Sequence, residues 1–133
     1  MKLVLNTDGG ARGNPGPGAI GIVLRDIEGS IIFELGKYIG NCTNNEAEYQ
    51  ALIEGIKVAI QKGATELECN LDSELVVKQL TGIYKVKEPR MQIFWQQAKE
   101  LELTGVKITY KHVARSLNKE ADKLVNSALD AAR

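Results

Sequence analysis

The chain has few of the features that mark secreted, zinc-binding or membrane-spanning proteins. Its 133 residues include only two cysteines, Cys42 and Cys69, too few and too far apart for a disulfide framework or a zinc site. No stretch approaches the roughly 18 apolar residues that a membrane helix needs. The N-terminus runs directly into a strand-like segment and shows no signal peptide. We therefore expect a cytoplasmic protein that makes no membrane contact.

The chain also lacks net charge, because 17 basic side chains balance 17 acidic ones, so no global attraction draws it to nucleic acid. The distribution is uneven, however. Residues 1–84 carry seven basic and eleven acidic side chains, whereas residues 85–133 carry ten basic and six acidic ones. A basic rim beside an acidic site and a chance segregation both fit this pattern, so it indicates little alone.

The hydrophobic content of 44% predicts one globular domain over residues 1–133, with a substantial core. Strands are predicted at residues 2–8, 19–26, 30–39, 65–71 and 106–111, with turn-rich loops at 9–18 and 112–117. Helices are predicted at residues 44–62, 73–81, 90–103 and 118–131. An antiparallel meander followed by βα units predicts an α/β fold, in which helices flank a mixed sheet.

Four carboxylates occupy unusual positions in this pattern. Asp8 and Asp72 end predicted strands, and in open α/β sheets ligands bind at the carboxyl ends of strands, so we expect the two to be neighbours. Glu48 lies on the core-facing side of the first helix, where a metal or a buried basic group must compensate for desolvation. Asp122 lies at the border of the buried face of the last helix. Together they predict an oxygen-only site for Mg²⁺ or Mn²⁺, suited to phosphoryl transfer.

Two of these carboxylates, Asp72 and Asp122, also have structural alternatives that the sequence leaves open, and the nearby Glu46 is explained by one. Thr43 and Glu46 match a capping box, so Glu46 has a sufficient structural role. Either Asp72 or Ser73 is suited to cap the helix at 73–81. Asp122 suits the positive end of the last helix.

The remaining polar candidates are one histidine and several uncharged side chains. His112 is the only histidine, and it is either a solvated loop residue or a proton shuttle beside a metal site. The glycine-rich loop predicted at residues 9–18 lacks the Gly-Lys-Ser/Thr sequence of a phosphate-binding loop. We therefore expect it to form a sharp turn between the first two strands. Side chains able to contact phosphates and sugar hydroxyls surround the expected site: Asn14, Thr43, Asn44 and Asn45.

Four segments, taken together, resemble the type 1 ribonuclease H family. They are residues 7–19 (TDGGARGNPGPGA), 43–48 (TNNEAE), 71–73 (LDS) and 118–122 (NKEAD). They occur in the family's order and spacing and span nearly the whole chain. The resemblance implies an RNase H-like fold, a five-stranded mixed sheet in the order 3-2-1-4-5 with helices on both faces. It also implies an endonuclease that hydrolyses the RNA strand of RNA/DNA hybrids and leaves 5′-phosphate and 3′-hydroxyl ends.

The resemblance assigns roles to individual residues. It implies metal binding by Asp8, Glu48, Asp72 and Asp122, with Glu48 rather than Glu46 at the family position, and a catalytic role for His112 as the mobile-loop histidine. The implied cofactor is two Mg²⁺ ions during catalysis, with Mn²⁺ as a substitute. The substrate-binding positions that follow from it are Gly9, Asn14, Thr43, Asn44, Asn45, Ser73, Arg115 and Asn118.

The chain departs from many bacterial members in two ways. Its connection at residues 82–90 (GIYKVKEPR) is short and only mildly basic, where those members carry a long basic protrusion. It also shows no separate hybrid-binding domain. We expect a monomer whose partner is an RNA/DNA hybrid, with the RNA/RNA duplex as a second candidate, and whose binding weakens steeply with salt. The alternative is a non-catalytic nucleic-acid-binding protein of the same fold, and Mg²⁺-dependent turnover separates the two.

Overall fold

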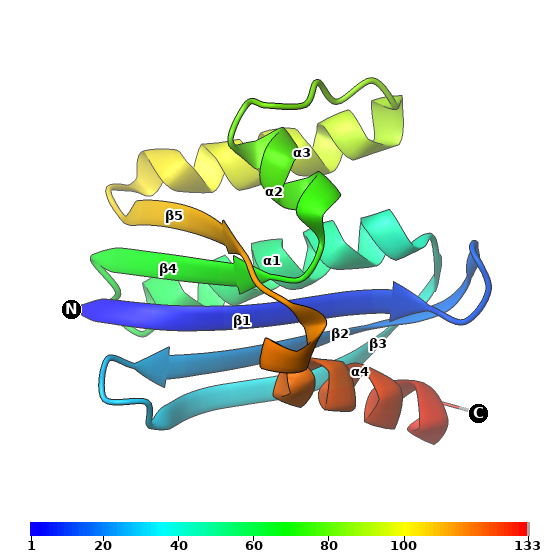
Figure 1. Ribbon diagram of the computed structural model, residues 1–133, viewed down its shortest axis with the longest axis horizontal. Coiled ribbons are helices and arrows are strands. Elements are labelled where there is room, and N and C mark those ends of the chain that lie inside the picture. The colour runs from blue at the N-terminus through cyan, green and yellow to red at the C-terminus, as the bar shows by residue number, and fades with distance from the viewer. Residues whose placement is uncertain (133) are drawn as a thin grey trace.

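The computed structural model describes residues 1–132 and is built on one five-stranded sheet (Figure 1). The strand order is β3-β2-β1-β4-β5. β1 to β3 form an antiparallel meander, whereas β4 runs parallel to β1 and β5 runs parallel to β4. The predicted mixed sheet and its order are therefore confirmed. The elements are β1 (Lys2–Ala11), β2 (Gly16–Asp26), β3 (Ile31–Cys42), α1 (Asn44–Gln61), β4 (Glu66–Leu71), α2 (Glu74–Leu80), α3 (Pro89–Leu101), β5 (Lys107–His112) and α4 (Lys119–Ala131).

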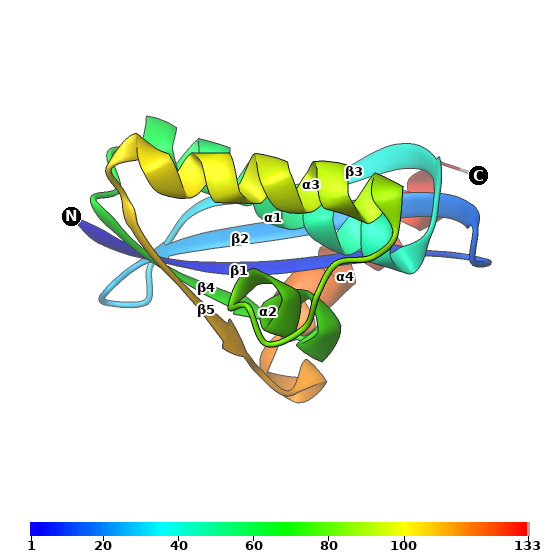
Figure 2. The ribbon, with the colours of Figure 1, turned by 90° about the horizontal axis from the view of Figure 1, so that it is seen from above.

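Helices cover both faces of the sheet, as Figure 2 shows from above, with α1 and α3 on one side and α4 on the other. The alternation of side chains along the strands explains this arrangement. On β1, Leu3 and Leu5 are fully buried in the larger core, which α1 shares. On α4, Ala121, Val125 and Leu129 are buried at a spacing of four residues and so form one apolar stripe.

The N-terminal hairpin is longer than predicted, and the loop expected at residues 9–18 is mostly strand. Gly9, Gly10 and Ala11 continue β1 and pair with residues 18–20 of β2, so the turn contains only residues 12–15. Glycine has a low intrinsic preference for strands, but cross-strand pairing outweighs it here. Asp8 therefore lies inside β1 rather than at its end.

Other element boundaries shift by a few residues. β3 continues to Cys42 instead of ending at residue 39, and the helix predicted to reach residue 103 ends as α3 at Leu101, followed by a short 3-10 turn. β5 includes His112, so this histidine ends a strand rather than beginning a loop. A second 3-10 turn, Arg115–Leu117, precedes α4.

The start of α1 confirms the predicted capping box. The Thr43 hydroxyl accepts the Glu46 N–H at 3.2 Å, and Glu46 Oε1 accepts the Thr43 N–H at 2.8 Å. The helix runs for 18 residues and is followed by Gly63, in the left-handed conformation with φ of 92°. Within residues 1–132, none of the helices is long and apolar enough to cross a membrane.

Candidate active site

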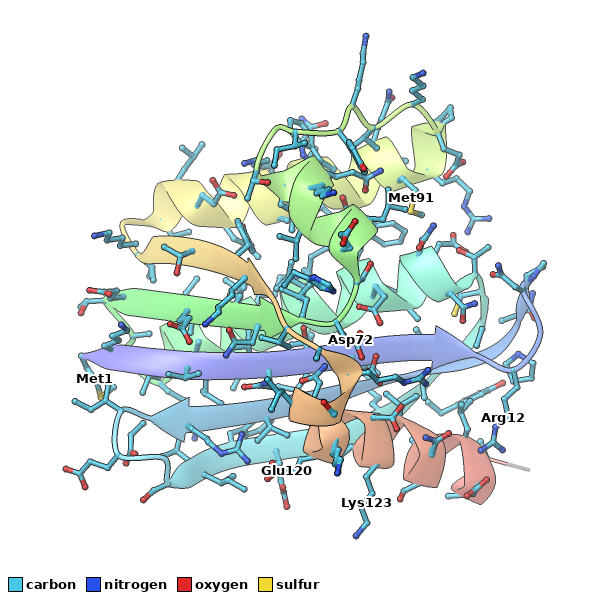
Figure 3. All side chains as sticks on the ribbon, viewed as in Figure 1. Met1, Arg12, Asp72, Met91, Glu120 and Lys123 are labelled. Carbon is cyan, nitrogen blue, oxygen red and sulfur yellow. The ribbon has the colours of Figure 1, made fainter. Side chains whose placement is uncertain are left out.

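Three carboxylates from three elements meet where β4 ends beside the neighbouring strand β1. Asp8 lies in β1, Glu48 in the second turn of α1, and Asp72 directly follows β4. One carboxylate oxygen from each lies within 4.8 Å of the other two. The parallel register pairs Thr7 with Leu71, which places the next residues, Asp8 and Asp72, side by side. Figure 3 labels Asp72 near the centre of the view, where it overlies β1. The expected neighbourhood of Asp8 and Asp72 is thus confirmed.

A glycine allows Glu48 to come this close to Asp8. The Gly9 N–H lies 3.0 Å from Glu48 Oε1 and 3.0 Å from Asp8 Oδ1, so one amide contacts both carboxylates. A Cβ atom at Gly9 would lie 2.3 Å from the backbone carbonyl carbon of Ala47, much closer than any real contact. Only glycine therefore permits α1 to pack against β1 at this level.

The fourth carboxylate, Asp122, lines the same surface cleft from the first turn of α4. Its Oδ1 atom lies 3.5 Å from Nη2 of Arg115, whose side chain is largely exposed. The position of α4 depends on a close approach to β2, because a Cβ at Gly21 would lie 2.2 Å from the Ala121 carbonyl oxygen. Asp122 therefore lies in the same cleft as the three clustered carboxylates, outside the group whose oxygens lie within 4.8 Å of one another.

Asn118, predicted as a substrate contact, lies beneath the start of α4 and is 2% exposed. Its Nδ2 donates to the Thr7 carbonyl at 2.8 Å, and its Oδ1 accepts from Asn6 Nδ2 at 3.0 Å. These bonds tie the beginning of α4 to β1, next to Asp8. Asn118 does not line the cleft, and its carbonyl accepts the Asp122 N–H at 3.1 Å.

Burial and mutual repulsion alter the acidity of the site. The pKa of Asp8 is raised to about 7, with removal from water as the largest cause. A hydrogen bond with Glu48 lowers this pKa, whereas the neighbouring Asp72 and Asp122 contribute to raising it. Burial and then Asp8 raise the pKa of Glu48 well above its ordinary value, although the Gly9 N–H stabilises the charged form. Without a cation, the cluster therefore holds protons more tightly than ordinary carboxylates do.

The donor set fits a hard divalent cation. Glu48 Oε2 is buried, and no donor in residues 1–132 lies within hydrogen-bonding distance of it. A buried carboxylate oxygen without a partner is costly unless a cation binds it. The ligand atoms are all carboxylate oxygens, which Mg²⁺ and Mn²⁺ prefer. Asp8, Glu48 and Asp72 would hold such an ion, with Asp122 beside them.

Five of the eight predicted substrate-binding residues line the cleft: Gly9, Asn44, Asn45, Ser73 and Arg115. Asn45 and Arg115 are exposed and project into solvent-accessible space. The Asn44 side chain is partly engaged, because its Oδ1 accepts the Ala11 N–H at 2.8 Å. The Ser73 hydroxyl accepts the Val76 N–H at 3.3 Å, so Ser73 rather than Asp72 caps α2.

Asn14 and Thr43 lie next to the cleft and do not line it. Asn14 Oδ1 accepts the Asn44 N–H at 3.0 Å, which connects the β1–β2 turn to the start of α1. Thr43 caps α1 through its hydroxyl. Both residues thus hold Asn44 and Asn45 at the edge of the site.

His112 also lies outside the residues that line the cleft. In the β4–β5 pairing, His112 lies opposite Leu71, the residue that precedes Asp72. The His112 side chain is 43% exposed. Its Nδ1 is 3.9 Å from Glu74 Oε2. The structure therefore places His112 on the strand next to the end of β4, with a partly exposed side chain.

Two polar residues of the cleft had no role in the sequence-based hypothesis, Arg12 and Asn126. Arg12, labelled in Figure 3 at the β1–β2 turn, pairs with Asp130 of α4 at 2.7 Å. Asn126 lies one helical turn after Asp122 and donates to its carbonyl at 3.1 Å. The sequence did contain a signal for Asn126, because residues four positions apart, such as Asp122 and Asn126, lie on the same face of a helix.

The fold and the site define a class of protein, α/β domains with a carboxylate cluster beside their two central strands. A family model described as "Reverse transcriptase-like" matches residues 6–128. The ribonuclease HI of Halobacterium salinarum is 46% identical over 94% of this chain. Its crystal structure superposes with a TM-score of 0.95 over 98% of this chain and 99% of that one. The chain therefore belongs to the type 1 ribonuclease H family.

Two further similarities are informative. The bifunctional protein Rv2228c of Mycobacterium tuberculosis is 44% identical over 99% of this chain, which spans 36% of that protein's length. This chain also spans 63% of the Halobacterium protein. LC11-RNase H1, solved in complex with an RNA/DNA hybrid, has a TM-score of 0.94 and is 41% identical, with 98% of each chain covered.

Proposed function

We propose that this protein is an endoribonuclease that hydrolyses the RNA strand of RNA/DNA hybrids, using two divalent metal ions and leaving 5′-phosphate and 3′-hydroxyl ends. The observation that carries the proposal is the carboxylate cluster, in which oxygens of Asp8, Glu48 and Asp72 lie within 4.8 Å of one another. The unpartnered, buried Glu48 oxygen supports the same conclusion. Family membership and the hybrid complex of a 41% identical relative agree with it.

When bound, Mg²⁺ or Mn²⁺ supplies the Lewis acidity that activates water and stabilises the leaving oxygen. Asp8, Glu48, Asp72 and Asp122 hold the ions. The Gly9 N–H fixes the orientation of two of these carboxylates through its contacts at 3.0 Å. The exposed His112 is the group proposed to move a proton to or from the departing strand.

Recognition of the substrate is assigned to the neutral groups at the start of α1. Asn44 and Asn45 line the cleft next to Glu48 and have the amide groups needed to hydrogen-bond ribose 2′-hydroxyls. Asn14 and Thr43 hold them in place. Arg115, exposed beside Asp122, supplies a guanidinium for a phosphate. A DNA strand lacks the 2′-hydroxyl, so it would not be cut.

The proposal is tested with one end-labelled RNA strand, offered alone, paired with DNA or paired with RNA, in Mg²⁺ and in EDTA. We expect Mg²⁺-dependent cleavage of the DNA-paired strand and none in EDTA. Cleavage of the RNA/RNA duplex as well would keep the chemistry and extend the substrate range. Hybrid binding without cleavage in either Mg²⁺ or Mn²⁺ would contradict the proposal and favour a non-catalytic binding protein.

We further propose that the protein acts as a monomeric single domain in the cytoplasm. Sedimentation of the purified chain, with and without a hybrid, tests the monomer. A dimer in both samples would contradict it.

A further inference from the structure

An ion pair outside the catalytic cluster joins the starts of α1 and α3. Nη2 of Arg90 lies 2.6 Å from Oε2 of Glu46. The Glu46 side chain is only 4% exposed, whereas that of Arg90 is 73% exposed. The other oxygen of Glu46 accepts the Thr43 N–H in the capping box. Glu46 therefore has two roles, and the cap explains only one of its oxygens.

Neither helix needs the ion pair in order to form. The Glu88 side chain caps α3 by accepting the N–H groups of Arg90 at 3.1 Å and Met91 at 3.2 Å. Met91 is buried, and Figure 3 labels it in the first turn of α3. Tyr49 and Phe94 stack between α1 and α3 with ring centroids 6.5 Å apart. The ion pair is an additional contact, and it joins the two helix starts directly.

The two helix starts belong to different parts of the proposed substrate surface. Asn44 and Asn45 lie at the start of α1, within the cleft. The connection from α2 to α3, which ends at Glu88, carries the exposed Lys85 and Lys87. Figure 1 shows this connection crossing above the sheet to the end where α1 begins. A duplex that contacts the asparagines and the lysines together requires one particular separation between them.

We propose that Arg90 and Glu46 form a positioning pair that sets the distance between the basic α2–α3 connection and the asparagines at the start of α1. This inference rests on the proposed function, because the positioned substrate is an RNA/DNA hybrid. Arg90 acts through Glu46 and is not itself a phosphate ligand. The pair contributes to hybrid affinity, and the carboxylate cluster performs the chemistry without it.

The Glu46→Gln variant isolates this role, because glutamine at the same position keeps a capping box while losing the charge. We expect Glu46→Gln and Arg90→Gln each to weaken hybrid binding and to raise KM by roughly three- to thirtyfold. This range corresponds to the usual interaction energy between two residues in contact. We expect kcat to stay within about twofold, since the carboxylates do not move. The double variant should bind the hybrid no more weakly than the single variant with the lower affinity.

Salt dependence separates positioning from direct phosphate contact. A phosphate contact at Arg90 would make the slope of log K against log salt shallower by about 1 in Arg90→Gln. It would also leave Glu46→Gln with unchanged or tighter binding. We expect the slope to be unchanged in both variants. Lys57→Gln, on the exposed outer face of α1, is the matched control for the lost charge and should bind as the wild type does.

Binding is measured by fluorescence anisotropy in EDTA, and again in Mg²⁺ with every variant made in an Asp72→Asn background. A wild-type chain that binds the hybrid and does not cleave it would refute the proposed function alone, since the affinities still test the pair. Additive losses, a shallower salt slope in Arg90→Gln, or a change in melting temperature with no change in affinity would each overturn the positioning role. A chain that binds no hybrid would overturn both proposals.

Discussion

Glu48 reaches Asp8 because Gly9, between them in space, has no side chain. The Gly9 N–H contacts both carboxylates, and α1 passes so close that a Cβ would lie 2.3 Å from the Ala47 backbone. The neighbouring Gly10 differs, because a Cβ there would meet its nearest atom at 3.9 Å. At the residue scale, the site therefore depends on one particular glycine as much as on its acids.

The Gly9→Ala variant should lose roughly a hundredfold in kcat, because the methyl group pushes α1 and Glu48 away from Asp8 and small displacements of catalytic groups cost that much. Its affinity for Mg²⁺ should also fall, as measured by calorimetry. Gly10→Ala is the control for fold and metal binding, with a melting temperature and Mg²⁺ affinity close to those of the wild type. Equal losses of Mg²⁺ affinity in the two variants would contradict this explanation.

The raised pKa of Asp8 makes stability depend on pH when Mg²⁺ is absent. The pKa is about 7 in the folded chain against an ordinary value of 3.8. Protonation therefore favours the folded state, and this contribution is lost as the pH rises through about 7. Between pH 5 and 8 we expect the metal-free protein to become less stable to urea as the pH increases. Mg²⁺ should restore more stability at pH 8 than at pH 5.

The Asp8→Asn variant tests the origin of that dependence. It removes one charge from the cluster, so the metal-free variant should be more stable than the wild type at pH 8 and vary less with pH. The same pH dependence in Asp8→Asn and in the wild type would show that other groups cause it.

At the element scale, α4 is the part most sensitive to substitution, because it holds Asp122 and rests on Gly21 and Asn118. We expect Gly21→Ala to lower kcat at least about tenfold, since the added methyl group displaces α4 from β2. Val23→Ala, on the same strand and fully buried, is the control, because it loses packing without pushing a helix away. Equal loss of activity in both variants would mean that activity follows stability alone.

The elements themselves were largely predictable from local patterns. The helical spacing of apolar residues and the capping box at Thr43 located α1, whose predicted and observed starts coincide at residue 44. The strand character of Gly9, Gly10 and Ala11 was not predictable, because it comes from pairing with β2 and not from local preference. The same cause extends β3 to Cys42.

The acids of the site were also predictable, whereas their scaffold was not. Asp8, Glu48 and Asp72 stood out because carboxylates rarely lie on a core-facing position or at a strand end. Asn118 was expected to contact substrate, but its partners, Thr7 and Asn6, are more than 110 residues away in sequence. Arg90 and Glu46 are also far apart in the sequence, so no local pattern indicates their ion pair.

At the scale of the whole molecule, zero net charge means that any attraction to a duplex must come from local basic groups. Exposed basic side chains lie on the α2–α3 connection, on β5 and near the start of α4: Lys85, Lys87, Lys111, Arg115 and Lys119. With a few phosphate contacts, we expect log K to fall with log salt at a slope of about −2 to −5. A flat response between low and physiological salt would contradict this expectation.

The catalytic role of the carboxylate cluster is tested most directly by Mg²⁺-dependent cleavage of an RNA/DNA hybrid. Cleavage by the wild type and by Asp72→Asn is compared, with hybrid binding measured in parallel. Asparagine keeps the size of the side chain and removes one charged metal ligand. We expect cleavage to fall by more than roughly a hundredfold, beyond what loss of a hydrogen bond to a metal ligand costs, while the fold and hybrid affinity remain. Full cleavage activity in Asp72→Asn would show that the carboxylate cluster is not the catalytic centre.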